Sequence, residues 1–349
     1  MSAAAGEEEN ESFEPPHPRE TQVLFGHGEA ERALLEAYRG SRVPHAWLIG
    51  GPPGTGKATL AYRLARFVLA HPDPQAPAVQ AATSLALPAD HPAARRVAAQ
   101  GHGDLLALER TEGETGRLRT VITVDQVRRT VSFFGSTAGA GGWRICIVDS
   151  ADELQYPQAA NALLKILEEP PPRALLLLVS DAPARLLPTI RSRCRRLMLR
   201  PLAETDVIRS AAHALGREAG DPELHEAALL AEGSVGRALA LLHGPALALR
   251  KRMGELLDRL PAVDPQALHA LGDAISGSEP QKLESFVDAV NAWLAARLEN
   301  PGRNSGQLFR LAEAWERINA AARDVDIYNL ERKPLVFRVF SWLAEAAHG

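Results

Sequence analysis

The chain has 349 residues, of which 46% are hydrophobic, enough to bury the cores of roughly two or three domains. Its 39 basic and 43 acidic residues give a net charge of −4, which excludes a strongly basic protein that coats nucleic acid. The two cysteines, Cys146 and Cys194, are too few for a disulfide framework or a four-cysteine zinc site, as is typical of a reducing cytoplasm. No run approaches the roughly 18 apolar residues of a membrane span, so we expect a cytoplasmic protein.

The first 200 residues divide into a polar segment and an α/β pattern. Residues 1–20 are acidic and contain prolines without an apolar stretch, so they predict a disordered acidic tail and not a signal peptide. From residue 21 to residue 200, apolar runs of strand length alternate with amphipathic helical segments, which predicts a parallel sheet with helices on both faces. Strands are expected at residues 46–49, 105–108, 144–148, 175–179 and 197–199, and helices at residues 29–39, 59–70, 123–134 and 157–168.

Three further segments lack this alternation. Residues 71–103 are rich in Pro, Ala and His and predict an insertion with one helix. Residues 201–250 predict a helical lid, and residues 251–349 predict an all-α C-terminal domain in which Trp and Phe recur at helical spacing, as in a packed core. The lid helices are expected at residues 204–216, 222–232 and 236–242. The predicted fold class is thus an α/β P-loop domain with a parallel sheet, followed by a helical lid and an all-α C-terminal domain.

A glycine-rich loop follows the first expected strand and precedes the second expected helix. This context is typical of a P-loop, whose backbone N–H groups and lysine bind nucleotide phosphates at a helix N-terminus. The candidate nucleotide-binding residues of the loop are Gly51, Pro52, Pro53, Gly54, Thr55, Gly56 and Lys57. The strand expected at residues 144–148 is followed by Asp149, which has the position of the Walker B carboxylate that helps to hold Mg²⁺.

Two positions depart from a working ATP site. A working P-loop carries Ser or Thr after its lysine to ligate Mg²⁺, whereas this chain carries Ala58, and Thr59 is rotated by about 100° on a helix. Related ATPases place a glutamate after the Walker B aspartate to polarise water, whereas this chain has Ser150. These losses predict weak binding of ATP or ADP without hydrolysis. The alternative is a rearranged site in which Thr59 and Asp152 substitute for the missing groups.

Several motifs together resemble the clamp-loader branch of the AAA+ proteins. They are residues 45–57 (HAWLIGGPPGTGK), Val148-Asp149, residues 161–170 (NALLKILEEP) and Ser192-Arg193-Cys194. The resemblance covers about residues 21–245 and extends to the rest of the chain only in length and helicity. It implies a non-hydrolysing subunit of the machine that opens a ring-shaped sliding clamp and closes it around primed DNA.

The resemblance assigns roles to two arginines. The Ser-Arg-Cys arginine of the family acts in trans as an arginine finger on the γ-phosphate held by a neighbouring subunit, and the matching residue here is Arg193. Such fingers are worth about 10³–10⁵ in rate. Arg237 lies in a segment that resembles the family's sensor-2 motif, near the chain's own nucleotide pocket. The alternatives are a solvated arginine in the basic run of residues 191–200, and a surface arginine at a helix start. Ser180 matches the sensor-1 position loosely.

The resemblance also implies partners. We expect motor subunits of the gamma/tau type and a delta-type subunit in a hetero-oligomeric ring, with the C-terminal domain as an oligomerisation collar. The sliding clamp and, inside the assembly, primer–template DNA complete the expected partners, and no membrane is expected. Many relatives carry a four-cysteine zinc knuckle after the first P-loop helix. The insertion here instead holds His71, His91 and His102, whose spacing does not suit zinc, so we expect no zinc and no other metal site.

Two other functions stay open at this point. One is a catalytically active AAA+ ATPase, such as the motor subunit of the same loader, against which Ala58 and Ser150 argue. The other is a P-loop kinase or transferase, against which the Ser-Arg-Cys segment and the C-terminal helices argue. We favour a subunit without ATPase activity of its own that forms part of a DNA-directed DNA polymerase (nucleotidyltransferase) holoenzyme.

Overall fold

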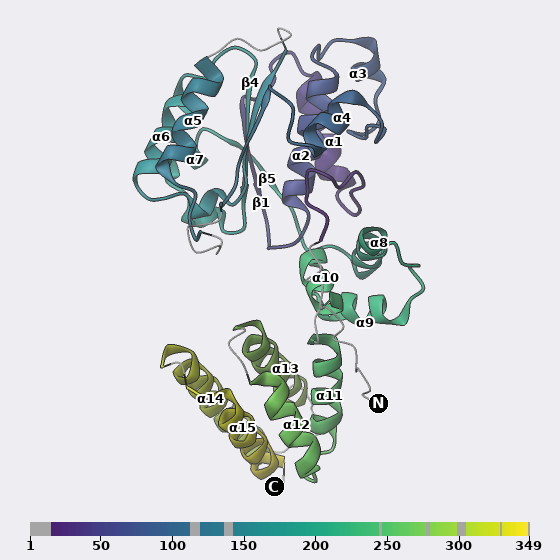
Figure 1. Ribbon diagram of the computed structural model, residues 1–349, viewed down its shortest axis with the longest axis vertical. Helices are drawn as coiled ribbons and strands as arrows, with labels where there is room; N and C mark the ends of the chain where they lie inside the picture. Colours follow the sequence, from purple (N-terminus) through teal and green to yellow (C-terminus); the bar gives the residue numbers. More distant parts are fainter. Residues whose placement is uncertain are drawn as a thin grey trace, which may run out of the picture. The chain divides into compact units, whose positions relative to one another are not determined.

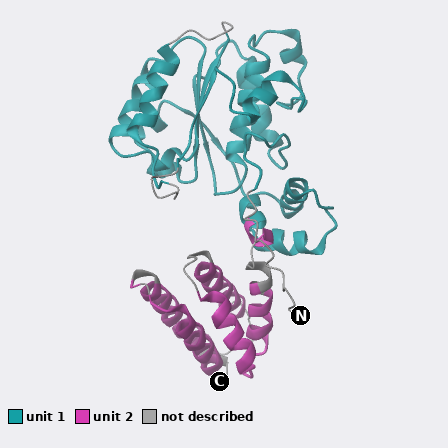
Figure 2. Ribbon diagram, viewed as in Figure 1, with its two compact units in different colours: residues 1–239 teal, residues 240–349 magenta. Residues whose placement is uncertain are grey.

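The computed structural model describes residues 15–111, 119–135, 142–243, 246–276, 280–298, 305–328 and 330–347. It divides into two compact units, Met1–Leu239 and Ala240–Gly349 (Figure 2). The first unit contains the sheet and the lid helices as far as Leu239, and the second unit is helical. Of the predicted acidic tail, residues 1–14 lie outside the described residues.

Five strands of the described residues form one parallel sheet, as the sequence predicts. Their order is β2-β3-β4-β1-β5, so β1 lies between β4 and β5. The strands are β1 (Ala46–Gly50), β2 (Leu105–Leu108), β3 (Arg144–Val148), β4 (Ala174–Ser180) and β5 (Arg195–Met198). Because all strands run in the same direction, the residues that follow β1, β2, β3 and β4 meet at one edge of the sheet.

Alternate residues of each strand pack into different cores. In β1, Trp47 and Ile49 belong to the core with α1 and α2, whereas Ala46 and Leu48 belong to the core with α5 and α6. This alternation follows from the two-residue period of a strand. Figure 1 shows α1 to α4 on one face of the sheet and α5, α6 and α7 on the other. The predicted three-layer α/β domain is confirmed.

The helices of this domain match the predicted segments closely. They are α1 (Gly28–Arg39), α2 (Lys57–Ala70), α5 (Val124–Gly135), α6 (Gln158–Glu168) and the short α7 (Pro188–Arg191), with 3₁₀ turns η1 (Ala151–Glu153) and η2 (Pro183–Arg185). The insertion at residues 71–103, which is fully described, forms two short helices rather than the one expected: α3 (Pro77–Ala81) and α4 (Pro92–Ala98). Each begins with proline, whose missing N–H group costs nothing in a first turn.

The remaining helices form the lid and the C-terminal unit. They are α8 (Glu204–Leu215), α9 (Pro222–Leu230), α10 (Val235–His243), α11 (Ala246–Asp258), α12 (Pro265–Ile275), α13 (Pro280–Leu298), α14 (Ser305–Ile327) and α15 (Arg332–Ala347). Phe286, Ile318 and Phe340 are buried in the C-terminal core, as their helical spacing predicts. No helix within the described ranges combines the length and the apolar character that a bilayer span requires.

Candidate functional site

The P-loop connects β1 to the first turn of α2. Gly51 has φ 149°, and a Cβ atom there would lie 2.6 Å from the backbone oxygen of Leu199. Gly54 has φ 71°, and a Cβ atom there would lie 3.0 Å from the backbone nitrogen of Gly236. Glycine is therefore required at both positions, for its positive φ and for the close approach of neighbouring backbone. The loop has the backbone form that the sequence predicts.

Residues outside the loop hold it in place. The buried ring of His27 donates from Nε2 to the carbonyl oxygen of Thr55 at 2.7 Å, and burial lowers the pKa of this histidine. From the lid, Ser234 Oγ donates to the carbonyl oxygen of Pro53 at 2.9 Å, and the backbone N–H of Gly236 donates to that of Gly54 at 3.2 Å. The start of α10 is thus hydrogen bonded directly to the tip of the P-loop.

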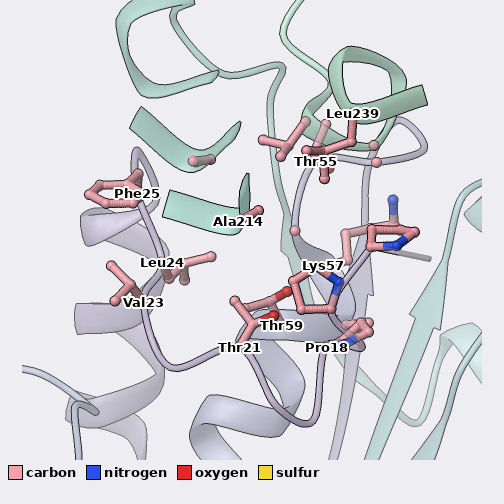
Figure 3. A pocket seen from close by; sticks show the side chains of 18 of the residues that line it. Pro18, Thr21, Val23, Leu24, Phe25, Thr55, Lys57, Thr59, Ala214 and Leu239 are labelled. Atoms are coloured by element: carbon pink, nitrogen blue, oxygen red, sulfur yellow. The ribbon is translucent and has the colours of Figure 1, made fainter. Parts of the chain in front are cut away.

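A cavity of about 750 Å³ opens beside the loop, a size typical of small-ligand sites. Three parts of the first unit line it: the N-terminal segment, the start of α2, and the lid helices α8 and α10, as Figure 3 shows for Leu24, Lys57, Ala214 and Leu239. Asp149 and Asp181, at the edge where the parallel strands end, complete the wall. The cavity therefore has the place that a P-loop nucleotide site requires.

Lys57 is engaged by groups of its own domain. Its Nζ atom lies 2.6 Å from Oδ1 of Asp181 and donates to the carbonyl oxygen of Pro52 at 2.5 Å. The side chain of Lys57 is 4% exposed, whereas that of Asp181 is 50% exposed. Asp181 directly follows β4, and its backbone N–H donates to Oδ1 of Asp152 at 3.0 Å. The lysine is thus positioned at the cavity but is already paired.

Asp149 lies at the end of β3, as the Walker B interpretation predicts. Burial, with smaller contributions from the negative charges of Glu109 and Asp181, raises its pKa to about 6. The next residue, Ser150, has φ 64° and begins the turn η1. A serine hydroxyl there lacks the charge to polarise water.

Glu109, directly after β2, connects the strand edge to the N-terminal segment. It accepts a hydrogen bond of 2.6 Å from the hydroxyl of Tyr62, and Nε2 of His17 lies 3.4 Å from its other oxygen. Burial alone would raise the pKa of Glu109, but the hydrogen bonds from His17 and Tyr62 lower it below its ordinary value. Buried Arg66 of α2 donates to the carbonyl oxygens of Arg19 and Thr21, so residues 15–21 run along the cavity wall.

The positions that lack catalytic groups lie at this cavity. Ala58, Thr59 and Ser150 all line it (Figure 3 labels Thr59). Asp152 does not line the cavity, and its carboxylate accepts the backbone N–H of Asp181. Of the two substitutes in the rearranged-site alternative, Thr59 therefore faces the cavity and Asp152 serves another contact.

Arg193 lies apart from this cavity, in the turn after α7. Its guanidinium donates to the carbonyl oxygen of Thr189 at 2.9 Å and pairs with Glu168 Oε1 of α6 at 2.8 Å. The side chains of Arg193 and Glu168 are 35% and 49% exposed, so the pair lies at the surface. The following Cys194 is buried in the core beneath α5 and α6. The cysteine thus anchors the turn while the arginine stays accessible.

The two sensor-like residues are placed differently from the loop residues. Arg237 pairs with Glu232 at 3.0 Å and is not among the residues that line the cavity, although its neighbours Val235 and Gly236 are. The Ser180 hydroxyl is buried without a hydrogen-bond partner and does not line the cavity either. At the end of β4 the group that faces the cavity is the next residue, Asp181.

The insertion at residues 71–103 is held by direct hydrogen bonds. Arg39 Nε donates to the carbonyl oxygen of Val79 at 2.8 Å, and Glu31 accepts the backbone N–H of Leu85 at 2.8 Å. The rings of His71 and His91 lie 6.5 Å apart. Within the described ranges, no group of three or more His, Cys, Asp or Glu side chains is placed to hold a metal ion.

Sequence reasoning missed Asp181, Glu109 and Ser234. A signal existed for the first two, because an acidic residue directly after each of two parallel strands must lie at the same edge as the P-loop. Ser234 lies in the segment that resembles the sensor-2 motif, but the sequence does not indicate its contact with Pro53, which is separated from it by 181 positions along the chain.

Comparison with known proteins gives a consistent set of relatives. Residues 26–203 match the family described as DNA polymerase III, delta subunit. The DNA polymerase III subunit delta' of Pseudomonas aeruginosa is 42% identical over 150 residues, which are 43% of this chain and 41% of that protein. The subunit delta' of Escherichia coli is 34% identical over 219 residues, which are 60% of this chain and 58% of that protein.

A relative of another type matches a longer part of the chain. The DNA polymerase III subunit tau/gamma of Haemophilus influenzae is 28% identical over 290 residues, which are 79% of this chain and 39% of that protein. The matches to the two delta' subunits span about half the length of those proteins.

Proposed function

Because this chain belongs to the family of the DNA polymerase III delta subunit, we propose that it is a non-hydrolysing clamp-loader subunit of the delta' type. In this role it helps to load the sliding clamp onto primed DNA within the polymerase holoenzyme. The relatives named DNA polymerase III subunit delta' support the proposal.

One observation carries the proposal: the chain keeps a formed P-loop beside a cavity but lacks both catalytic side chains there. Ala58 offers no hydroxyl to Mg²⁺, and Ser150 offers no carboxylate to an attacking water. Lys57 is also paired with Asp181 rather than free for a phosphate. The cavity can hold a small ligand, but nothing described in it would activate the γ-phosphate.

The second half of the proposal is an arginine finger. Arg193 would reach across a subunit interface and place its guanidinium on the γ-phosphate bound by a neighbouring motor subunit. Its partial exposure and its anchored turn support this role, since a finger must be both accessible and fixed. The planar guanidinium suits the charge that develops on a transferred phosphoryl group.

The proposed partners follow from the family. They are motor subunits of the gamma/tau type and a delta-type subunit in one ring, with the helical C-terminal unit as the proposed collar. The sliding clamp and primer–template DNA are proposed partners of the assembled loader. The net charge of −4 disfavours tight DNA binding by the isolated chain, because such binding depends on neutralised phosphates.

The runner-up is a motor ATPase of the same loader. It is favoured by the match to a tau/gamma subunit over 79% of this chain and by the presence of Thr59 at the cavity. An ATPase assay of the purified full chain with Mg²⁺ separates the two proposals. We expect no turnover above background. A magnesium-dependent rate that Lys57→Ala abolishes would establish the motor function instead.

A further inference from the structure

Two of the three N–H donors of the Lys57 ammonium group are engaged within its own domain. They make the contacts to Asp181 Oδ1 at 2.6 Å and to the carbonyl oxygen of Pro52 at 2.5 Å. The side chain is 4% exposed, so little water competes for these contacts. A phosphate that approaches Lys57 therefore meets a cation that is already hydrogen bonded and charge-compensated.

Asp181 gives Lys57 the kind of anionic oxygen partner that a phosphate would give. Its carboxylate presents anionic oxygen acceptors at salt-bridge distance, and its backbone is held by the hydrogen bond to Asp152. The carboxylate lines the cavity and is half exposed, so it keeps part of its hydration while it pairs. A triphosphate on this loop would have to displace Asp181 and then lie beside its uncompensated charge.

The negative charge of the cavity wall also disfavours the binding of a triphosphate. The described residues that line it include one lysine and three carboxylates, Glu20, Asp149 and Asp181, of which Glu20 pairs with Arg19 at 3.6 Å. The negative charge of Asp181 also helps to raise the pKa of Asp149, after the larger effect of burial. An added anion of high charge is thus repelled at the place where a working P-loop attracts it.

We propose that Asp181 is an internal counter-ion that keeps nucleoside triphosphates off this P-loop by occupying Lys57. The proposal rests on the proposed non-hydrolysing function, which it deepens: besides lacking catalytic groups, the site carries its own substitute for the phosphate. The exclusion depends on ligand charge, so it acts on ATP and spares uncharged adenosine.

Isothermal titration of the full-length chain with ATP in the presence of Mg²⁺, and separately with adenosine, tests this role. We expect Asp181→Asn to bind ATP at least tenfold more tightly than wild type, while adenosine affinity changes less than twofold. The matched control is Asp152→Asn, which removes the same charge nearby and keeps an oxygen to accept the N–H group of Asp181. We expect it to raise ATP affinity less than threefold.

Several results would overturn the proposal. One is an unchanged ATP affinity in Asp181→Asn, checked in Asp181→Ala with the fold confirmed by circular dichroism. Equal gains in the Asp181 and Asp152 variants would indicate the general field of the acidic residues instead, and an equal gain for adenosine would indicate a change of cavity shape. The proposed function fails by a different result, ATP turnover by the wild-type chain, so the two failures are distinguishable.

Discussion

The P-loop cavity and the turn of residues 192–194 each hold a cation suited to a phosphate, but in different surroundings. Lys57 is 4% exposed, and its partner Asp181 lies in the same cavity wall. Arg193 is 35% exposed, and its partner Glu168 is itself half exposed on the neighbouring helix α6. The first cation is enclosed by its own domain, whereas the second can exchange one surface partner for another.

The difference shows how the surroundings of a cation set its availability to an outside anion. A surface ion pair contributes about 0–1 kcal/mol, so a guanidinium can leave such a partner at little cost when another anion arrives. For a buried ammonium, removal of the partner without replacement costs much more free energy, because the charge is left buried and uncompensated. Arg193 is therefore more available to an outside anion than Lys57, as the proposed function requires.

Replacement of Arg193 tests the more accessible of the two cations and has the largest expected effect. If Arg193 is the proposed finger, Arg193→Ala should lower turnover at the neighbouring ATP site by about 10³-fold or more, because the transition state loses that guanidinium. Turnover by the assembled complex should fall only in part, since the variant alters only the ATP site that faces this chain. Steady-state ATPase and clamp-loading assays of the reconstituted complex measure the loss.

Neighbouring arginines supply the controls for this experiment. Arg193→Lys should rescue poorly, because an ammonium lacks the planar fork of a guanidinium. Arg195 lies over the ring of Trp47, and Arg196 is exposed, so Arg195→Ala and Arg196→Ala should leave turnover nearly unchanged. Equal losses in all three alanine variants would indicate a diffuse basic patch, and wild-type turnover in Arg193→Ala would remove the finger.

The pH dependence of stability that Asp149 causes tests how enclosed the P-loop cavity is. Burial raises its pKa from 3.8 to about 6, so between these values the unfolded chain gives up this proton before the folded chain does. The folded state therefore loses stability as pH rises through this window. Relative to wild type, Asp149→Asn should be about 1 kcal/mol more stable at pH 8 than at pH 5, because its side chain does not titrate.

Unfolding in urea is monitored by amide hydrogen exchange in β3 and β4. These two strands report on the stability of the sheet domain alone. Asp125→Asn is the matched control, since it makes the same chemical change at a carboxylate that is 84% exposed and does not line the cavity. A constant offset between Asp149→Asn and wild type across the pH range would show that this carboxylate carries no buried-charge penalty.

Glu168 gives the smallest expected effect and sharpens the contrast between the two ion pairs. Glu168→Gln removes a partner of Arg193 that is 49% exposed, a change worth at most about 1 kcal/mol. Turnover by the assembled complex should then change by less than about fivefold. Glu169→Gln, an equally charged change at an adjacent exposed position, is the control. A change of a hundredfold would mean that Glu168 fixes Arg193 firmly.

Most of the secondary structure of the sheet domain could be predicted because its signals are local. The strands at residues 105–108 and 144–148 match their predicted bounds, since short apolar runs bounded by polar residues leave little choice of register. The second helix of the insertion was missed, because a segment of seven residues that starts with proline shows too little periodicity to distinguish it from a loop. The P-loop was recognised from its spacing between a strand and a helix.

The pairings within the candidate site could not be predicted, since they join residues that are distant in sequence. Lys57 meets Asp181 because β4 lies beside β1 in the sheet, although β2 and β3 intervene in the chain. The lid contact from Ser234 to the carbonyl oxygen of Pro53 depends in the same way on how α10 folds back. Sequence alone indicated Arg237 at the pocket, whereas the fold places the backbone of Gly236 there.

The sequence by itself determined which chemical groups this protein has: a P-loop with its lysine, no hydroxyl at position 58, a serine at position 150, and a Ser-Arg-Cys turn. These are properties of residue types and short spacings, which act through local backbone geometry. Only the tertiary structure decided which cation is enclosed and which is presented. Exposure and ion pairing depend on the order of strands and on the helices that cover them, and a linear pattern does not contain that order.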